Sequence, residues 1–308
     1  MSRPLVSVLM AALNHEGFAA AAVSSILDQD YEALELIAID DCSDDATADV
    51  LEECAAAASA GRMRVVRHDR RLGIAATRAH ALSLARGDFV GLLDSDDLWL
   101  PGKLGPQVDL LLAEPEVGLT HAAFEAFASA TGERVAWDVD PWDPEGDQLV
   151  ELVRRGCFVM TGTTLIRRAA IDRRGVGFTS SGYASYDDYL LFLALALDYR
   201  LAYEPRLVMR YRRHAGNLTT TLLAGNIAQA RLQLLSDFVA RFPEAHRRLG
   251  GDWRRVRARL LVSAAAHEGF RDPQRAARSL LGGIRQHPGE ALDEVARHTR
   301  ARLARRSA

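Results

Sequence analysis

Short apolar runs alternate with amphipathic segments along the first part of the chain. Buried strands are predicted for the runs at residues 5–10, 34–39, 63–67 and 89–93. Apolar residues recur at helical spacing in the segments between them, at residues 18–29, 46–58 and 74–86. Strands that alternate with helices in this way are typical of parallel βαβ units, so the pattern predicts an α/β fold.

Acidic residues follow two of these predicted strands. Asp40 and Asp41 come after the second strand, and the stretch Asp94-Ser95-Asp96-Asp97 follows the fourth. Right-handed βαβ units place the carboxyl ends of their strands at one edge of the sheet, where α/β proteins bind ligands. Clustered carboxylates at that edge favour a hard divalent cation that holds phosphate oxygens. The alternatives are a solvated acidic turn, or an N-cap cluster for a helix that Pro101 would start.

The charge is distributed unevenly along an otherwise ordinary globular composition, with 48% hydrophobic and 26% charged residues among 308. The formal net charge is −3, but residues 225–308 contain 17 arginines and no lysine against 8 acidic residues. This segment therefore carries +9 and residues 1–224 carry −12, which indicates two functional regions. The arginine-rich region suits an acidic protein partner or a membrane with anionic lipids, or it is a solvated helical face. Nucleic acid fits less well, because aromatic residues are not interleaved with the basic ones.

Cysteine usage and the chain start favour a cytoplasmic protein. Cys42, Cys54 and Cys157 have no paired spacing, so neither a disulfide framework nor a zinc site is expected. Met1-Ser2-Arg3-Pro4 leads directly into the first strand without a signal peptide, and no apolar run approaches the ~18 residues of a membrane span. The sequence also lacks a G-x-G-x-x-G turn, a Walker A loop and a G-x-S-x-G elbow, so the dinucleotide, P-loop and α/β-hydrolase classes are not supported.

Short motifs occur in a definite order between residues 4 and 220. In chain order they are Val6–Met10 with Asn14, Ile39–Thr47, Arg71–Arg78, Leu92–Asp97, Tyr186-Asp187 and Tyr211–His214. Each motif is weak alone, but their order resembles that of the inverting family-two glycosyltransferases. The resemblance implies the GT-A fold, a Rossmann-like, mixed and mainly parallel sheet flanked by helices, here with a C-terminal helical extension.

The resemblance implies a nucleotide-sugar donor and a role for each matching residue. Asp41 would accept a hydrogen bond from the base, and Arg78 would lie against the nucleotide or its diphosphate, unless it is an exposed helix arginine. Asp94 would face the ribose and Asp96 would hold Mn²⁺ or Mg²⁺, completing the D-x-D motif. Further donor contacts are implied for Ala11, Leu13, Asn14, Ser95 and Arg213. His214 is implied as a second metal ligand.

Two donor positions depart from the family's pattern. Ala11 stands where many members have Pro or Thr, and Leu13 stands where an aromatic residue commonly stacks on the base. Because Leu13 offers apolar contact alone, the identity of the base is open. UDP is the default, with dTDP or GDP as alternatives.

The general base is implied at the start of a helix that opens with Ser185-Tyr186-Asp187-Asp188. Family members usually have Glu-Asp here, and Asp187 takes the Asp position while Tyr186 replaces the Glu. A one-residue shift would make Asp188 part of the pair, so Asp188 is the second choice. A carboxyl needs a raised pKa to act as a base near neutral pH, and burial can supply this. The alternative is a capping carboxylate favoured by the helix dipole.

The segment between the motifs is expected to form the acceptor side. Two tryptophans and three aspartates suit a sugar-binding wall or ordinary loop packing: Trp137, Asp138, Asp140, Trp142 and Asp143. Residues 159–166 read as a strand with Met160, Gly162 and Thr164 on one face. Two closing strands are predicted at residues 201–203 and 207–211. A helical hairpin, similar to a tetratricopeptide unit, is predicted at residues 253–270 and 273–286. One such unit cannot bury its own apolar face, so we expect it to pack on the catalytic region or on another chain.

The sequence therefore predicts a catalytic domain at residues 1–224 and an arginine-rich helical extension at 225–308. Residues 1–116 would form the nucleotide half and residues 117–224 the acceptor half. The expected function is metal-dependent, inverting sugar transfer to a saccharide or lipid-linked acceptor, in cell-envelope polysaccharide or glycolipid synthesis. The extension would bind a membrane or protein partner, or support a homo-oligomer, at the inner face of the membrane. The alternatives are a degenerate sugar-nucleotide-binding protein and a scaffold that acts through the basic extension.

Overall fold

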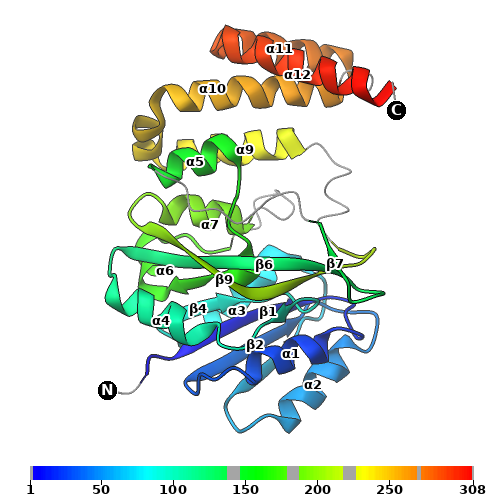
Figure 1. The fold of residues 1–308 in the computed structure, drawn as a ribbon, viewed down its shortest axis with the longest axis vertical. Helices are drawn as coiled ribbons and strands as arrows, with labels where there is room; N and C mark the ends of the chain where they lie inside the picture. The colour runs from blue at the N-terminus through cyan, green and yellow to red at the C-terminus, as the bar shows by residue number, and fades with distance from the viewer. Residues whose placement is uncertain (1–2, 137–145, 179–186, 218–226, 269–271, 307–308) are drawn as a thin grey trace. The chain divides into compact units, whose positions relative to one another are not determined.

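The computed structural model describes residues 3–136, 146–178, 187–217, 227–268 and 272–306. The chain divides into two compact units. The first contains the described residues up to 148, then 157–178 and 187–215, and the second contains 149–156 and the described residues from 216 onward. The strands of the first unit form a single sheet with helices flanking it (Figure 1).

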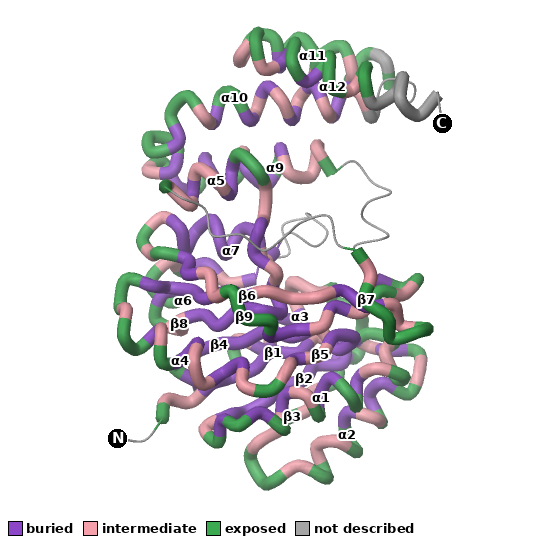
Figure 2. The backbone as a smooth tube through the Cα atoms, viewed as in Figure 1, coloured by how far each residue is buried: buried purple, intermediate pink, exposed green. Residues whose placement is uncertain are grey.

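The first half of the sheet is parallel, as the sequence predicts. Its strands lie in the order β3–β2–β1–β4, with bounds β1 Val6–Ala12, β2 Leu34–Asp40, β3 Met63–Arg67 and β4 Phe89–Leu92. The connecting helices are α1 (Ala19–Leu27), α2 (Thr47–Ala57) and α3 (Ile74–Leu84). Every residue of β2 and β4 is buried, because helices cover parallel strands on both faces (Figure 2).

The second half of the sheet mixes strand directions. It continues from β4 through β8 (Leu165–Arg167), β6 (Val117–Ala128), β9 (Arg200–Arg213) and β5 (Leu98–Trp99), with β7 (Arg134–Val135) paired to β6. β8 is antiparallel to both of its neighbours, whereas β6 and β9 run parallel. The helices of this half are α4 (Leu104–Ala113), α6 (Arg168–Arg174) and α7 (Asp187–Leu195). The predicted mixed, mainly parallel architecture is confirmed.

Pro101 does not start a helix, so that detail of the prediction is wrong. Leu98 and Trp99 instead extend as β5 and pair with β9, and the Leu100 amide donates to the Val208 carbonyl at 2.8 Å. The chain then turns at Gly102, whose φ of +78° favours glycine, and α4 begins at Leu104.

Two predicted strand boundaries also differ from the structure. Residues 159–166 are not a continuous strand, because the hydroxyls of Thr163 and Thr164 donate to the carbonyls of Met160 and Thr161 at 2.7 Å each. These local bonds support a 3₁₀ turn (η1, Thr161–Thr163), and β8 begins only at Leu165. The two predicted closing strands are one strand, β9, which shifts register against β6 near Ala123.

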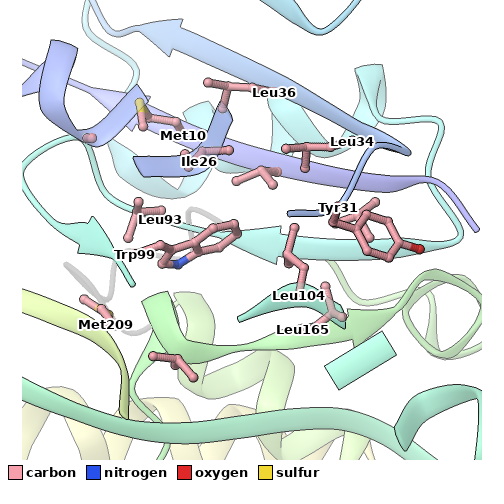
Figure 3. Packing of buried hydrophobic residues seen from close by; sticks show 14 of the residues in the cluster. Met10, Ile26, Tyr31, Leu34, Leu36, Leu93, Trp99, Leu104, Leu165 and Met209 are labelled. Carbon is pink, nitrogen blue, oxygen red and sulfur yellow. The ribbon is translucent and has the colours of Figure 1, made fainter. Parts of the chain in front are cut away.

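The core of the first unit lies against the parallel strands. Met10, Ile26 and Leu36 pack together with Trp99 and Leu104 (Figure 3). Trp99 is 3% exposed, and its indole N–H donates to the Gly162 carbonyl at 2.7 Å. Gly91 lies against this ring, and a Cβ there would come within 3.0 Å of the Trp99 side chain, a tighter contact than is usual.

The second unit is helical and buries part of its apolar surface between its own helices. It contains α9 (Ile227–Arg241), α10 (Pro243–Glu268, kinked at Gly250), α11 (Pro273–Gln286) and α12 (Pro288–Arg306), and residues 149–155 of α5 (Gln148–Arg155). The predicted hairpin exists as α10 and α11, with Asp272 capping α11. It contacts α9 and α12, while Leu281 of α11 and Leu292 of α12 remain exposed. The expectation that the hairpin packs on the catalytic region or on another chain stays a prediction. Among the described residues, no helix is both long and apolar enough to cross a membrane.

Candidate functional site

The carboxyl ends of three parallel strands bring the predicted site residues to one edge of the sheet. Ala12 at the end of β1 aligns with Asp40 at the end of β2, and Leu9 of β1 aligns with Leu92 of β4. The residues that follow these strands, Asn14, Asp41 and Asp94, therefore lie at the same edge, although ~80 residues separate the first from the last.

Asp41 is buried and held by its own chain. Its carboxylate accepts the backbone N–H groups of Leu72 and Gly73 at 2.8 Å each, and it lies 2.8 Å from His68 Nδ1. Burial alone would raise the pKa of Asp41, but these hydrogen bonds lower it below its usual range. Asp41 thus fixes the loop before α3. The base of a bound nucleotide would have to share the Asp41 carboxylate with these donors.

Arg78 connects two carboxylates that are far apart in the sequence. Its Nη2 lies 2.7 Å from Asp94 Oδ1, and its Nη1 lies 3.2 Å from Asp187 Oδ2. The Arg78 side chain is 6% exposed, so the alternative of an exposed helix arginine is wrong. Burial would lower the pKa of Arg78, but the charges of Asp94 and Asp187 raise it, so the guanidinium stays charged.

Asp187 and Asp188 begin α7 in different environments. The Asp187 side chain is 1% exposed and faces Arg78 on α3, a contact that capping does not explain. Asp188 accepts hydrogen bonds from the Thr161 hydroxyl and, at 2.6 Å, from the Tyr189 amide. Burial and the adjacent charge of Asp187 raise the pKa of Asp188 to about 6. When two adjacent carboxyls have different partners, their pKa values can differ, so that one is protonated while the other is ionised and can accept a proton.

Asp96 lies among imidazoles. His214 Nε2 is 3.0 Å from Asp96 Oδ2, and His15 Nε2 is 3.9 Å from the same oxygen. Burial opposes ionisation of Asp96, but the hydrogen bond from His214 and the charges of both histidines lower its pKa. One nitrogen from each histidine and one Asp96 oxygen all lie within 4.8 Å of one another. This donor set fits a divalent transition metal, because imidazole and carboxylate are common ligands of such ions.

The sequence reasoning missed His15, and it included Arg212 only as part of the Tyr211–His214 motif. His15 follows Asn14 directly after β1, so its position at the acidic edge was the available signal. The Arg212 amide donates to Asp97 Oδ1 at 2.8 Å and its Nε donates to the Asp96 carbonyl at 2.7 Å. These bonds join the end of β9 to the acidic stretch. Burial and the neighbouring carboxylates raise the pKa of Asp97 well above its usual range.

The remaining predicted donor residues occupy the same edge. Leu13 is 37% exposed, Ala11 is half-buried, and the Asn14 side chain accepts the Asp44 amide at 2.8 Å. Ser95 is buried and contacts His15, while Arg213 is exposed at the end of β9. Trp137, Trp142, Tyr186 and the aspartates at 138, 140 and 143 lie outside the described residues.

Curated proteins with similar sequences match between 36% and 74% of this chain in the two examples that follow. The putative teichuronic acid biosynthesis glycosyltransferase TuaG of Bacillus subtilis (strain 168) is 37% identical over 110 residues, which are 36% of this chain and 43% of that protein. The UDP-Glc:alpha-D-GlcNAc-diphosphoundecaprenol beta-1,3-glucosyltransferase WfaP of Escherichia coli is 29% identical over 231 residues, 74% of this chain and 85% of that protein. The match thus spans less than half of the first relative's length and most of the second's.

Solved glycosyltransferases share the fold. Residues 1–349 of S. aureus TarS, in complex with UDP-GlcNAc, superpose with a TM-score of 0.62 at 14% identity, covering 93% of this chain and 90% of that one. The mannosyltransferase PcManGT from Pyrobaculum calidifontis, in complex with GDP-Man and Mn²⁺, gives 0.54 at 20% identity, covering 97% and 76%. The family described as "Glycosyl transferase family 2" matches residues 7–175, more than half of the chain. This chain therefore belongs to glycosyl transferase family 2.

Proposed function

We propose that this chain transfers a sugar from a nucleotide sugar to an acceptor hydroxyl, with inversion at the anomeric carbon and with a divalent metal ion. The observation that carries the proposal is the pairing of a buried carboxylate, Asp187, with the acidic edge through Arg78. The carboxylate proposed as the base and three side chains that could hold a metal ion therefore occur in the same unit. UDP is the default nucleotide, as named in the E. coli relative and the TarS complex.

In the proposed reaction, Asp187 accepts the proton of the acceptor hydroxyl as its oxygen attacks the anomeric carbon. The bond from that carbon to the phosphate oxygen breaks, and the nucleoside diphosphate leaves with the electron pair. Asp96 and His214 would hold the ion, which supplies positive charge to the departing diphosphate when bound. Arg213, exposed beside His214, would contact the phosphates, and Arg78 would orient Asp187.

Nucleotide binding is the first test. We expect UDP with Mn²⁺ to raise the thermal midpoint, since a ligand at a hundredfold excess over its Kd stabilises by ~2.7 kcal/mol. The panel also contains dTDP, GDP and ADP, each with and without Mn²⁺. Asp96→Ala should lose the metal-dependent rise, whereas Asp49→Asn, an exposed aspartate on α2, should retain it. No rise with any nucleotide would refute donor binding and favour a scaffold role.

Sugar transfer is the second test. Asp187→Asn should still bind the nucleotide but lose transfer by ~10²–10⁴-fold, the usual contribution of a general base. Asp188→Asn, measured in the same way, shows which of the two carboxylates acts as the general base. Nucleotide binding by the wild-type protein without transfer to any saccharide or lipid-linked acceptor would favour the alternative of a sugar-nucleotide-binding protein.

For location, we propose peripheral binding to anionic membranes through the second unit. Apolar side chains are exposed on α11 and α12, with Leu281 at 60%, Ile284 at 39% and Leu292 at 65%. Residues 281 and 284 share a helical face, and Arg278 and Arg285 lie within one turn of them. Basic helices with an apolar face bind anionic bilayers, and the acceptor named for the E. coli relative is lipid-linked. A membrane surface would also bring an acceptor of that kind to the enzyme.

Vesicle flotation tests this location with the full chain. Vesicles that contain phosphatidylglycerol should carry the wild-type protein, and neutral phosphatidylcholine vesicles should not. The double variant Leu281→Glu/Ile284→Glu should lose binding. Leu112→Glu should keep it, because Leu112 is 54% exposed on α4 in the other unit. Equal flotation of both variants would contradict the proposal.

A further inference from the structure

We propose that His15 is a third protein ligand of the metal site, and that this site binds a divalent transition metal without nucleotide. The inference rests on the proposed function, which uses Asp96 and His214 alone. A site with one carboxylate normally needs substrate phosphates to complete the coordination of its ion. Three side-chain ligands would remove that requirement and set the order in which ion and donor bind.

The distances fit a shared ion. His214 Nε2 and His15 Nε2 lie 3.0 Å and 3.9 Å from Asp96 Oδ2, and the widest separation within the group is below 4.8 Å. Two atoms that bind one ion at ~2.1 Å can be no more than ~4.2 Å apart. Side-chain movements of about 0.6 Å or less therefore close the group around an ion.

His15 is oriented for this role by its other ring nitrogen. His15 Nδ1 lies 2.8 Å from the hydroxyl oxygen of Ser95, which is fully buried. With Nδ1 protonated and donating to Ser95, the lone pair of Nε2 points to the Asp96 side. Metal-ligating histidines almost always use their second nitrogen for such an outer contact, which fixes the tautomer and the ring orientation.

The segment that carries His15 is held at several points. The His15 amide donates to the Thr47 hydroxyl at 2.7 Å, and the preceding Asn14, with a φ of +55°, bonds to Ser43 and Asp44. The Phe18 ring lies 5.9 Å from the His15 ring and 4.8 Å from the His214 ring, between centroids. Both imidazoles are therefore packed, so little order has to be gained when an ion binds.

The donor set also predicts which ion binds. Mg²⁺ prefers oxygen ligands and retains its waters, whereas imidazole suits later divalent metals and is accepted by Mn²⁺. Three ligands from separate segments, after β1, β4 and β9, leave further coordination positions for diphosphate oxygens. We therefore expect Mn²⁺ to bind the nucleotide-free protein with a stoichiometry of one, and Mg²⁺ to bind it much more weakly.

The test measures Mn²⁺ binding to the full chain without nucleotide, by calorimetry and by electron paramagnetic resonance. His15→Gln should weaken binding at least ~10–100-fold, the loss expected even for an outer contact, while His246→Gln, an exposed histidine on α10, should change nothing. Pulsed spectroscopy should detect two coupled imidazole nitrogens in wild type and one in His15→Gln. Circular dichroism and the thermal midpoint verify that the variant is folded.

Two outcomes would overturn the inference. One is wild-type protein that binds Mn²⁺ only with UDP, and the other is an unchanged affinity and nitrogen coupling in His15→Gln. Neither outcome touches the proposed transfer, which is measured separately with donor and acceptor. Conversely, nucleotide-free Mn²⁺ binding through His15 without any response to nucleotides would support this inference and refute the proposed function.

Discussion

Replacing Arg78 by methionine tests the charge arrangement at the centre of the site. Methionine retains much of the side-chain length but removes the guanidinium that lies 2.7 Å from Asp94 and 3.2 Å from Asp187. The two carboxylates then differ in how far water can hydrate them. The Asp94 side chain is 38% exposed and can be hydrated, whereas the Asp187 side chain is 1% exposed. The cost should therefore come mainly from Asp187.

The expected loss of unfolding free energy is ~3–5 kcal/mol, the usual cost of leaving a buried charge without its partner. The ion pair of Arg78 with the partly exposed Asp94 should contribute no more than ~1 kcal/mol of this loss, as solvent-exposed pairs do. Because asparagine at position 187 carries no charge, Arg78→Met/Asp187→Asn should recover most of the loss. A double-mutant cycle should thus give a coupling energy of at least ~2 kcal/mol between Arg78 and Asp187.

Urea unfolding followed by tryptophan fluorescence and circular dichroism measures these free energies. Arg71→Met is the matched control, since the ion pair of Arg71 with Asp44 is exposed, and its loss should cost less than ~1 kcal/mol. A loss below ~1 kcal/mol in Arg78→Met, or additive effects in the double variant, would refute the reasoning that Arg78 neutralises a buried Asp187.

Three further substitutions test buried groups by urea or thermal unfolding. Burial lowers the pKa of Lys103 to about 7. Between pH 7 and 10.5 the unfolded chain therefore binds one proton more than the folded chain, so the free energy of unfolding should rise with pH. Lys103→Met should lose this rise, and parallel pH profiles of the variant and the wild type would contradict it. Burial raises the pKa of Asp188 to about 6, so ionising this carboxyl lowers the free energy of unfolding as the pH rises from about 4 to 6. Asp188→Asn should therefore stabilise the protein at pH 7 by up to ~3 kcal/mol, and a destabilised variant would refute this. Gly91→Ala should cost ~1–3 kcal/mol, because its Cβ would lie 3.0 Å from Trp99, whereas a neutral effect would show that the indole can shift.

Local patterns in the sequence predicted the parallel half of the sheet and the placement of its acidic strand ends. These features follow from short-range rules, since apolar runs form buried strands and βαβ units all turn in the same direction. The errors occurred where local hydrogen bonds or pairing compete with propensity. The hydroxyl of Thr163 bonds to a nearby carbonyl and delays β8, and Trp99 pairs with β9 before a helix can begin.

Local patterns could not predict the contacts that define the candidate site, because these contacts join distant segments; the family resemblance alone placed Asp96 and His214 on one ion. Arg78 and Asp187 are 109 residues apart, and His214 and Asp96 are 118 residues apart. No periodicity or spacing rule links such positions in a single sequence. Likewise, residues 149–155 of α5 belong to the helical unit although they lie in the middle of the chain.

The balance of charge at the acidic edge gives a physical reason for a divalent ion in the proposed reaction. Asp94 and Asp187 share the single guanidinium of Arg78, so that group of three retains a net negative charge. Asp96 adds a further carboxylate whose ionised form is favoured by His214. A nucleoside diphosphate that entered this edge would bring additional negative charge and would be repelled at short range. An ion held by Asp96 and the two imidazoles would reverse the sign of the local field where the phosphates must lie, and would leave the Arg78–Asp187 contact undisturbed.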